Sequence, residues 1–364
     1  MAFDATHAFA TYSRTYFDKE YYRENKSLLN KTLLVFLIGP IFIFSIYTFN
    51  KSIEQASMAF TIFNRFALCF AYYHLIRQHW GFIALYRKKN GENDNLSKKL
   101  DGLLLFFGTL FPFTSGQIDN IQATHIAETM SKSISSDHWI IMGNYLIVIG
   151  LSLIIASIIP QIKKLDLKLN IIGLIILSCA LFINLFVFYG IAHVLKVISY
   201  IALIGFLLTS LIYIYISFVN KKITFRNYPK WLLLFSVIIT YNIAFHISLP
   251  IFILYAAVTV FHNIQYHKIV HFHNVNKYKS TEFKKHGFAV ILTQKILVFI
   301  TLAVLFNLVS YVPRIASAQM SVLLPNYILS TLFWGVAFHH YVLDSIIWRI
   351  KKDQKLNTAL NINN

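Results

Sequence analysis

Histidine is the residue type whose number and spacing in this chain suggest chemistry. The 364 residues include 14 histidines, and the stretch FHNIQYHKIVHFHN (261–274) alone holds four of them. An imidazole is costly in a lipid-facing helix, because it gives up its hydrogen bonds to water. Neutral imidazole is also the commonest metal ligand in proteins. We therefore expect these side chains to meet buried partners or a metal ion.

Three clusters repeat one spacing along the sequence. Each contains two potential ligands five residues apart: His74 and His79, His262 and His267, and His339 and Asp344. Five helical residues turn a side chain by about 140°, so one ion cannot easily bind both members of a pair. Two neighbouring ions, or one ion and a contact between helices, can use both. Two pairs spaced by four residues share a helical face and can clamp one ion: His267 with His271, and His340 with Asp344.

The clusters predict a metal site with ligands from several helices. The predicted ligands are His74, His79, His262, His267, His271, His339, His340 and Asp344, with His7, Asp18 and His273 as candidates to complete the set. Asn263, Gln265 and Tyr266 lie between ligands and can orient imidazole rings through the second ring nitrogen. Imidazole and carboxylate ligands without thiolates suit iron, zinc or manganese. We expect iron, as one ion or two, with zinc or manganese as alternatives.

The remaining histidines have ordinary interpretations. Four of them, His125, His138, His193 and His246, fall towards the opposite side of the expected membrane and are predicted to be structural. His286 follows Lys284 and Lys285, and we expect it in a solvated stretch. Any single histidine at a membrane edge can also be an interfacial anchor. The repeated five-residue spacing favours ligation over anchoring for the three clusters.

The elements that must position the clusters are transmembrane helices. Hydrophobic residues make up 57% of the chain and charged residues 13%, about half the charge of a soluble domain. Apolar runs of about 18 to 24 residues match the thickness of a hydrocarbon core. We predict an all-α, polytopic bundle of about ten spans. These lie at about 32–49, 56–78, 101–115, 139–159, 169–190, 197–219, 231–249, 250–272, 288–311 and 323–347.

Lysine and arginine alternate between rich and poor loops, which predicts that both termini are cytoplasmic. We expect a cytoplasmic, interfacial amphipathic segment at 1–30, a transmembrane domain at 31–349 and a cytoplasmic polar tail at 350–364. The net charge of +18 lies in short loops, so it indicates topology and attraction to anionic lipids rather than nucleic-acid binding. This arrangement is typical of a multi-pass protein of a bacterial inner membrane. It also places all three clusters at the cytoplasmic ends of their helices.

The clusters resemble the histidine boxes of membrane di-iron oxygenases, the fatty-acid desaturases and hydroxylases. HLIRQH (74–79) and HNIQYH (262–267) look like their H-x4-H boxes, and HHYVLD (339–344) is similar to a double-histidine box. The chain departs from that family in its span number, in Asp344, and in lacking an H-x2-HH box. A second, architectural resemblance is to the bacteriorhodopsin-related membrane proteins that cleave carotene. Both resemblances imply iron and oxidation chemistry, but neither is close enough to carry a substrate over. We expect a lipid or isoprenoid substrate because the site lies at the membrane.

Physical reasoning leads to the same expected function. A metal at the lipid boundary can reach a C–H bond of a molecule that never leaves the bilayer, and redox iron can attack such a bond. We expect a non-haem oxidoreductase with one or two irons at the cytoplasmic leaflet. Its expected partners are membrane lipids, an apolar small-molecule substrate and an electron-donor protein. The alternatives are a multi-pass transporter of metal ions or small molecules, which would need ligands along a path across the membrane, and a bis-histidine haem protein.

Overall fold

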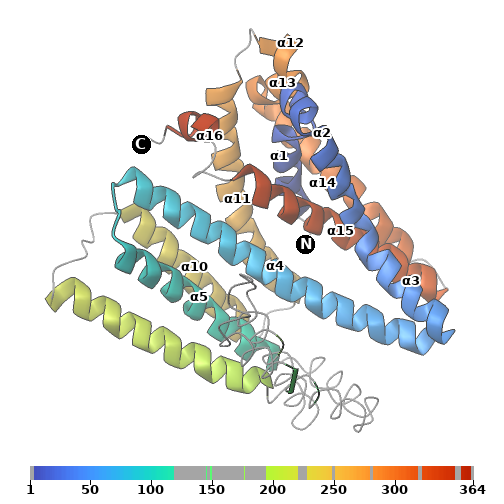
Figure 1. Cartoon of the computed structure of the whole chain (residues 1–364), viewed down its shortest axis with the longest axis horizontal. Coiled ribbons are helices and arrows are strands. Elements are labelled where there is room, and N and C mark those ends of the chain that lie inside the picture. Colours follow the sequence, from blue (N-terminus) through green and yellow to red (C-terminus); the bar gives the residue numbers. More distant parts are fainter. Residues whose placement is uncertain are drawn as a thin grey trace, which may run out of the picture. The chain divides into compact units, whose positions relative to one another are not determined.

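The computed structural model describes residues 4–118, 145, 148, 149, 176, 194–219, 228–247, 251–278, 282–318, 322–348 and 354–361. Every regular element within these ranges is a helix (Figure 1), which confirms the all-α prediction for this part of the chain. The expected spans at 139–159 and 169–190 lie almost entirely outside the described residues. His125, His138 and His193 lie outside them as well.

The chain divides into two compact units. Unit 1 comprises Met1–Asp94, Arg226–Leu234 and Leu249–Asn364, and unit 2 comprises Asn95–Phe225 and Phe235–Ser248. All of the predicted ligands belong to unit 1. The predicted boundaries at residues 30 and 349 separate the transmembrane domain from the two cytoplasmic segments, and they stay a prediction.

Unit 1 is built around one central helix. Its helices are α1 (Asp4–Arg14), α2 (Lys19–Thr32), the short η1 (Leu33–Leu37), α3 (Ile38–Asn50), α4 (Ile53–Lys89), α11 (Ile251–Lys277), α12 (Phe283–His286), α13 (Phe288–Gln294), α14 (Ile296–Ala318), α15 (Leu323–Ile347) and α16 (Gln354–Ala359). The α15 helix contacts α1, α3, α4, α14 and η1. It therefore carries its histidines into the middle of the unit.

Two glycines allow neighbouring backbones to approach α15 closely. A Cβ added at Gly39 of α3 would lie 2.6 Å from Cβ of Thr331, and one at Gly335 would lie 2.6 Å from Cδ1 of Phe36. Both distances are shorter than carbon atoms tolerate, so only glycine fits at these points. Small residues at helix contacts are typical of membrane bundles. This packing sets the position of the following turn of α15, which bears His339 and His340.

The α1 helix is an interior element of unit 1. Its residues from His7 to Thr15 are all buried, and the helix packs against α11, α14 and α15 (Figure 1). Other helices therefore cover α1, and the predicted interfacial position of residues 1–30 at the membrane stays a prediction. Its sequence HAFATYSRT contains small and hydroxyl-bearing residues on every side, which lets three helices surround it. In the predicted polar tail, Leu356 of α16 is also buried.

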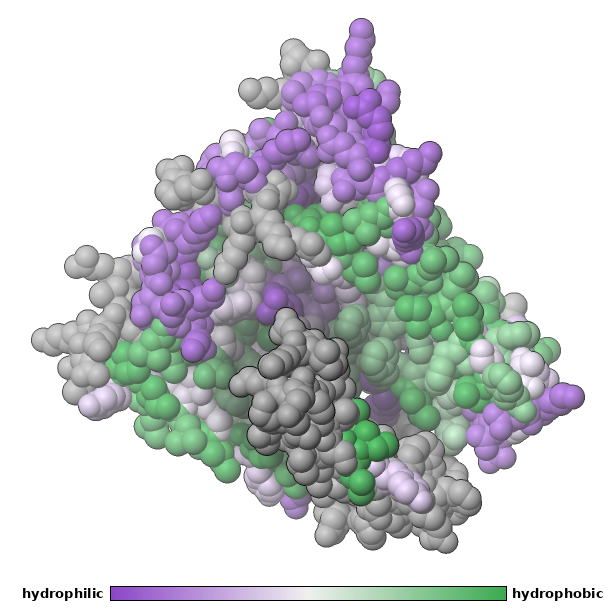
Figure 2. Space-filling view, viewed as in Figure 1, coloured by the Kyte–Doolittle hydropathy of each residue, from purple (hydrophilic) through white to green (hydrophobic). Residues whose placement is uncertain are grey.

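Three helices of the described chain are long and apolar enough to cross a membrane: Lys19–Asn50, Val194–Ser217 and Tyr228–His246. A fourth candidate is the bent pair Phe288–Gln294 and Ile296–Val312, with an angle of 113°. The prediction of about ten spans is thus not met. The expected spans at 56–78, 101–115, 250–272 and 323–347 are helical, but polar side chains lower their hydropathy. Figure 2 shows hydrophobic residues over α3 and α14 and hydrophilic ones around α12.

Unit 2 holds α5 (Asn95–Ile118), the helix Val194–Ser217, the π-helical η2 (Tyr215–Val219) and most of α10 (Tyr228–His246). Its helices also meet at glycines, since a Cβ at Gly205 would lie 2.8 Å from the ring of Phe107. His246 is hydrogen-bonded at Nδ1 to the carbonyl of Asn242, 3.0 Å away, and its Nε2 lies 3.3 Å from the Ser115 hydroxyl.

Candidate metal centre

Three histidines from three helices converge in the middle of unit 1. His7 of α1, His74 of α4 and His340 of α15 each offer a ring nitrogen, and these atoms all lie within 4.8 Å of one another. The three residues are 2%, 8% and 0% exposed. A metal ion with bonds of about 2.1 Å holds nitrogen ligands about 3.4 Å apart in a tetrahedral site. Small side-chain rotations would therefore close the triad around one ion.

Two further histidines extend the triad. The ring of His262 lies 5.1 Å from that of His7, and His79 lies 5.4 Å from His262, measured between centroids. Both extra rings are fully buried. Neither nitrogen of His262 has a hydrogen-bond partner among the described residues. Because buried polar atoms are nearly always paired, this ring is arranged for a ligand from outside the chain.

A hydroxyl from α1 determines which nitrogen of His340 is free for a metal. Oγ1 of Thr11 lies 2.7 Å from Nδ1 of His340 and donates a 2.9 Å hydrogen bond to Asp344. A threonine hydroxyl has one proton, so once Asp344 accepts it, only a protonated Nδ1 can complete the contact with His340. That tautomer puts the lone pair of His340 on Nε2, where the Gln78 amide lies 3.4 Å away and would have to give way to a metal ion. A second-nitrogen hydrogen bond of this kind orients metal-binding histidines in general.

Asp344 supports the triad from beside it. Its Oδ1 accepts a 2.7 Å hydrogen bond from the Tyr266 hydroxyl, and its Oδ2 accepts a short one from the Gln78 amide. The carboxylate lies 3.5 Å from Nδ1 of His340 and 4.0 Å from Nε2 of His74. With its lone pairs so engaged, Asp344 is placed to position the two imidazoles. Direct ligation would require it to release some of these donors.

His339 points away from the triad. Its Nδ1 lies 2.9 Å from the Tyr12 hydroxyl, and its Nε2 lies 3.0 Å from the hydroxyls of both Tyr16 and Thr32. Adjacent helical residues differ by about 100° in direction, so His339 and His340 cannot face the same point. Of the predicted ligands on α15, His339 is therefore committed to hydroxyl groups of α1 and α2.

The three later histidines of α11 are not brought into the triad. His267 is half-buried, and its Nε2 lies 3.2 Å from the Thr6 hydroxyl. His271 is also half-buried, and the described structure gives it no contact with the other histidines. His273 is buried, with its Nδ1 3.0 Å from the Asn274 side-chain oxygen. The pair His267 and His271 thus lies outside the triad, and its role as a clamp for an ion stays a prediction.

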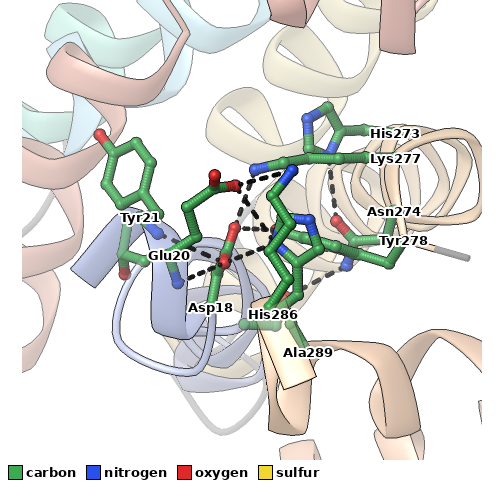
Figure 3. Close-up of polar contacts among 12 residues, drawn as sticks. Asp18, Glu20, Tyr21, His273, Asn274, Lys277, Tyr278, His286 and Ala289 are labelled. Carbon is green, nitrogen blue, oxygen red and sulfur yellow. Dashed lines mark hydrogen bonds and ion pairs between the residues drawn. The ribbon is translucent and has the colours of Figure 1, made fainter. Parts of the chain in front are cut away.

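Asp18 belongs to a separate polar cluster (Figure 3). Its carboxylate caps α2 by accepting from the backbone of Glu20, and it accepts a 2.8 Å hydrogen bond from Lys277 and a 2.9 Å one from Tyr278. Burial raises the pKa of Asp18, but the Lys277 charge and the hydrogen bonds from Lys277 and His286 outweigh it, so the net pKa lies below its ordinary value. Asp18 thus ties α2 to α11 and α12.

His286 is part of the same cluster, contrary to the expectation of a solvated stretch. It is only 3% exposed, and its Nδ1 lies 2.9 Å from the Asp18 carboxylate. The neighbouring lysines misled the prediction, because α12 is a single turn that directs Lys285 outward and His286 inward. Figure 3 shows the ring turned towards Asp18.

The predicted orienting residues have mixed placements. Asn263 is buried, and Gln265 lies beside His79. Tyr266 bonds to Asp344 and Thr11 rather than to an imidazole. The sequence prediction missed Thr11 and Gln78, although each stands four residues after a triad histidine. A hydroxyl or amide one turn from a buried histidine is the signal that would have found them.

The triad and its supporting hydrogen bonds thus present lone pairs of buried imidazoles from helices far apart in the sequence. Such a nitrogen-rich donor set suits iron, zinc or copper ions. Comparison with known proteins adds no assignment: no protein-family model, no curated protein and no solved structure matches this chain.

Proposed function

We propose that this chain is a multi-pass membrane metalloprotein, a non-haem iron oxidoreductase that acts on a lipid or isoprenoid at the cytoplasmic leaflet. The observation that carries the proposal is the convergence of His7, His74 and His340, with ligand atoms within 4.8 Å of one another. The alternating basic loops support cytoplasmic termini and an inner-membrane location. The buried nitrogens of His262, which have no hydrogen-bond partner among the described residues, would supply a ligand for a second ion next to the first.

The surroundings of the triad fit an apolar substrate. His74 stacks on the Tyr341 ring at a centroid distance of 3.8 Å. Tyr341 belongs to a buried hydrophobic cluster that also includes Phe63 and Phe338. A bound iron ion would supply the redox chemistry that an unactivated C–H bond needs. The chain itself would exclude water with these rings and hold His340 in one tautomer through Thr11. Dioxygen would be the oxidant and be reduced to water, and the additional electrons would come from a separate donor protein.

Metal analysis of the purified, detergent-solubilised chain tests the proposal. We expect one or two iron ions per chain in the wild type. His340→Ala should lose the metal, because it removes a ligand from the triad. His339→Ala is the matched control, since it alters the adjacent buried histidine but leaves all triad nitrogens in place. It should keep the metal even if it lowers stability.

Three results would overturn parts of this function. Equal metal loss in His340→Ala and His339→Ala would show that metal binding does not depend on the triad histidine in particular. Stoichiometric zinc without iron, after iron-replete expression, would exclude the redox function. The intense absorption band of haem near 400 nm would replace the non-haem centre with a haem protein.

A further inference from the structure

Arg14, at the end of α1, is a buried cation without a fixed counter-charge. The residue is 6% exposed, and its Nε and Nη1 atoms have no hydrogen-bond partner among the described residues. An arginine side chain stays protonated in proteins. A buried charge without a partner costs several kcal/mol on the general scale for such groups. An additional anion would pair with these two N–H groups and offset this cost.

The groups around Arg14 do not neutralise it. Its guanidinium carbon lies 4.0 Å above the Trp348 ring, a favourable cation–π contact without a negative charge. Burial lowers the pKa of Arg14, and the favourable effects of Tyr266, Tyr278 and Asp344 do not offset it. Asp344 is already engaged by Thr11, Gln78 and Tyr266. The Asp344 charge acts on Arg14 from nearby, but no hydrogen bond from the guanidinium to a carboxylate is found among the described residues.

The neighbourhood of Arg14 is apolar on one side and polar on the other. Trp348 packs against a hydrophobic cluster that includes Phe9 and Val270. On the polar side, His273 lies 6.4 Å from Trp348 between ring centroids. A molecule with an anionic head and an apolar body matches both sides. A small free anion would gain only the contact with the cation.

We propose that Arg14 and Trp348 form a binding site for the oxyanion headgroup, carboxylate or phosphate, of a membrane amphiphile. The anion pairs with the guanidinium, and the apolar chain of the amphiphile lies against the half-buried ring of Trp348. Trp348 also donates a 3.1 Å hydrogen bond to Tyr266, which in turn bonds to Asp344. The site thus adjoins the metal centre through two side chains. Binding at Arg14 does not require a metal, so this inference stands apart from the proposed function.

Native mass spectrometry of the full chain in a neutral detergent tests the site. The probes are oleate, oleyl alcohol, dioleoyl phosphatidic acid and inorganic phosphate, titrated under identical conditions. A charge-assisted hydrogen bond contributes a factor of about ten to a hundred in affinity. We expect oleate or phosphatidic acid to bind at least tenfold more tightly than oleyl alcohol and inorganic phosphate. Whichever lipid shows this preference identifies the headgroup as carboxylate or phosphate.

Substitutions then assign the preference to Arg14. Arg14→Gln should remove it, and Arg14→Lys should keep part of it. Arg23→Gln is the matched control, because it removes an exposed arginine from the same N-terminal segment. Equal binding of oleate, phosphatidic acid and oleyl alcohol by the wild type would overturn the proposal. So would unchanged lipid preference in Arg14→Gln. If that variant does not fold, a lipid preference in Arg14→Lys as strong as in the wild type would overturn the assignment to Arg14 instead.

Discussion

The hydroxyl of Thr11 offers the sharpest test of how the metal centre is held together. It contacts His340, Asp344 and Tyr266 at 2.7, 2.9 and 2.7 Å. Thr11→Val keeps the shape of the side chain but removes all three contacts. His340 then loses the close hydroxyl partner of its Nδ1, and the tautomer that exposes Nε2 is favoured only by the more distant Asp344 carboxylate, 3.5 Å from Nδ1. Asp344 keeps two of its donors, so we expect the protein to remain folded.

The expected effect on metal affinity follows from the role of this hydrogen bond. Removing the partner of a ligating histidine typically weakens metal binding 10- to 100-fold. That range corresponds to about 1.4 to 2.7 kcal/mol of binding free energy. The metal-free protein loses in addition about 1 to 3 kcal/mol of stability, because a buried donor and acceptor lose a partner. Competition of the apoprotein with a chromophoric chelator measures the first quantity, and thermal unfolding measures the second.

Thr15→Val is the matched control in the same N-terminal segment. Thr15 is as deeply buried as Thr11, but its hydroxyl donates to the backbone carbonyl of Thr11, 3.0 Å away. That contact involves no side chain of the centre, so its loss should leave metal affinity within about twofold of the wild type. Equal affinities for Thr11→Val and Thr15→Val would refute the assignment of the His340 tautomer to Thr11.

Three further predictions concern charge, packing and metal removal. The pKa of Asp18 is lowered in the folded state. Its carboxylate therefore stabilises the protein fully above about pH 4, the ordinary pKa of an aspartate. This contribution to stability is lost as the pH falls through the folded-state pKa. The thermal midpoints of the wild type and Asp18→Asn should therefore converge below about pH 4, and a constant gap would contradict the linkage. Gly39→Ala should cost about 1 to 3 kcal/mol through overpacking, whereas Gly81→Ala, with no atom within 4 Å of the added carbon, should be neutral or stabilising in an unfolding assay. A chelator should lower the thermal midpoint of the wild type but not that of His340→Ala. A bound ion at about a hundred times its dissociation constant adds about 2.7 kcal/mol to the free energy of unfolding. Equal shifts in both proteins would show that the ion binds elsewhere.

The spacing of residues in the sequence predicted the helices and the residue types of the metal centre. It did not predict which faces of these helices meet. The clusters at 74–79 and 339–344 each supplied one member of the triad, and His7 was among the candidates. The choice between His339 and His340 depends on the rotation of α15, which Gly39 and Gly335 set through contacts with α3 and η1. No periodicity in one sequence reports such a rotation.

The number of spans was overestimated for a related physical reason. Hydrophobic run length detects apolar helices but does not tell whether a helix faces lipid or other helices. In α4 and α15 the polar residues that interrupt the apolar run, such as His74 and Asp344, are buried among neighbouring helices. Burial in protein likewise explains α1, whose short length and mixed composition suggested a surface helix.

The order of synthesis gives the buried position of α1 a further consequence. Thr11 and Asp344 are separated by 333 positions in the chain. At about 5 to 20 residues per second, α1 leaves the ribosome about 17 to 67 s before Asp344 of α15. The side of α1 that faces α15 therefore stays uncovered until α15 arrives, even after α11 and α14 have been synthesised. The centre can load an ion only after α15 has emerged, so a nascent chain is protected from premature metallation. A separately synthesised peptide of residues 1–15 should accordingly restore metal binding to a chain that lacks them.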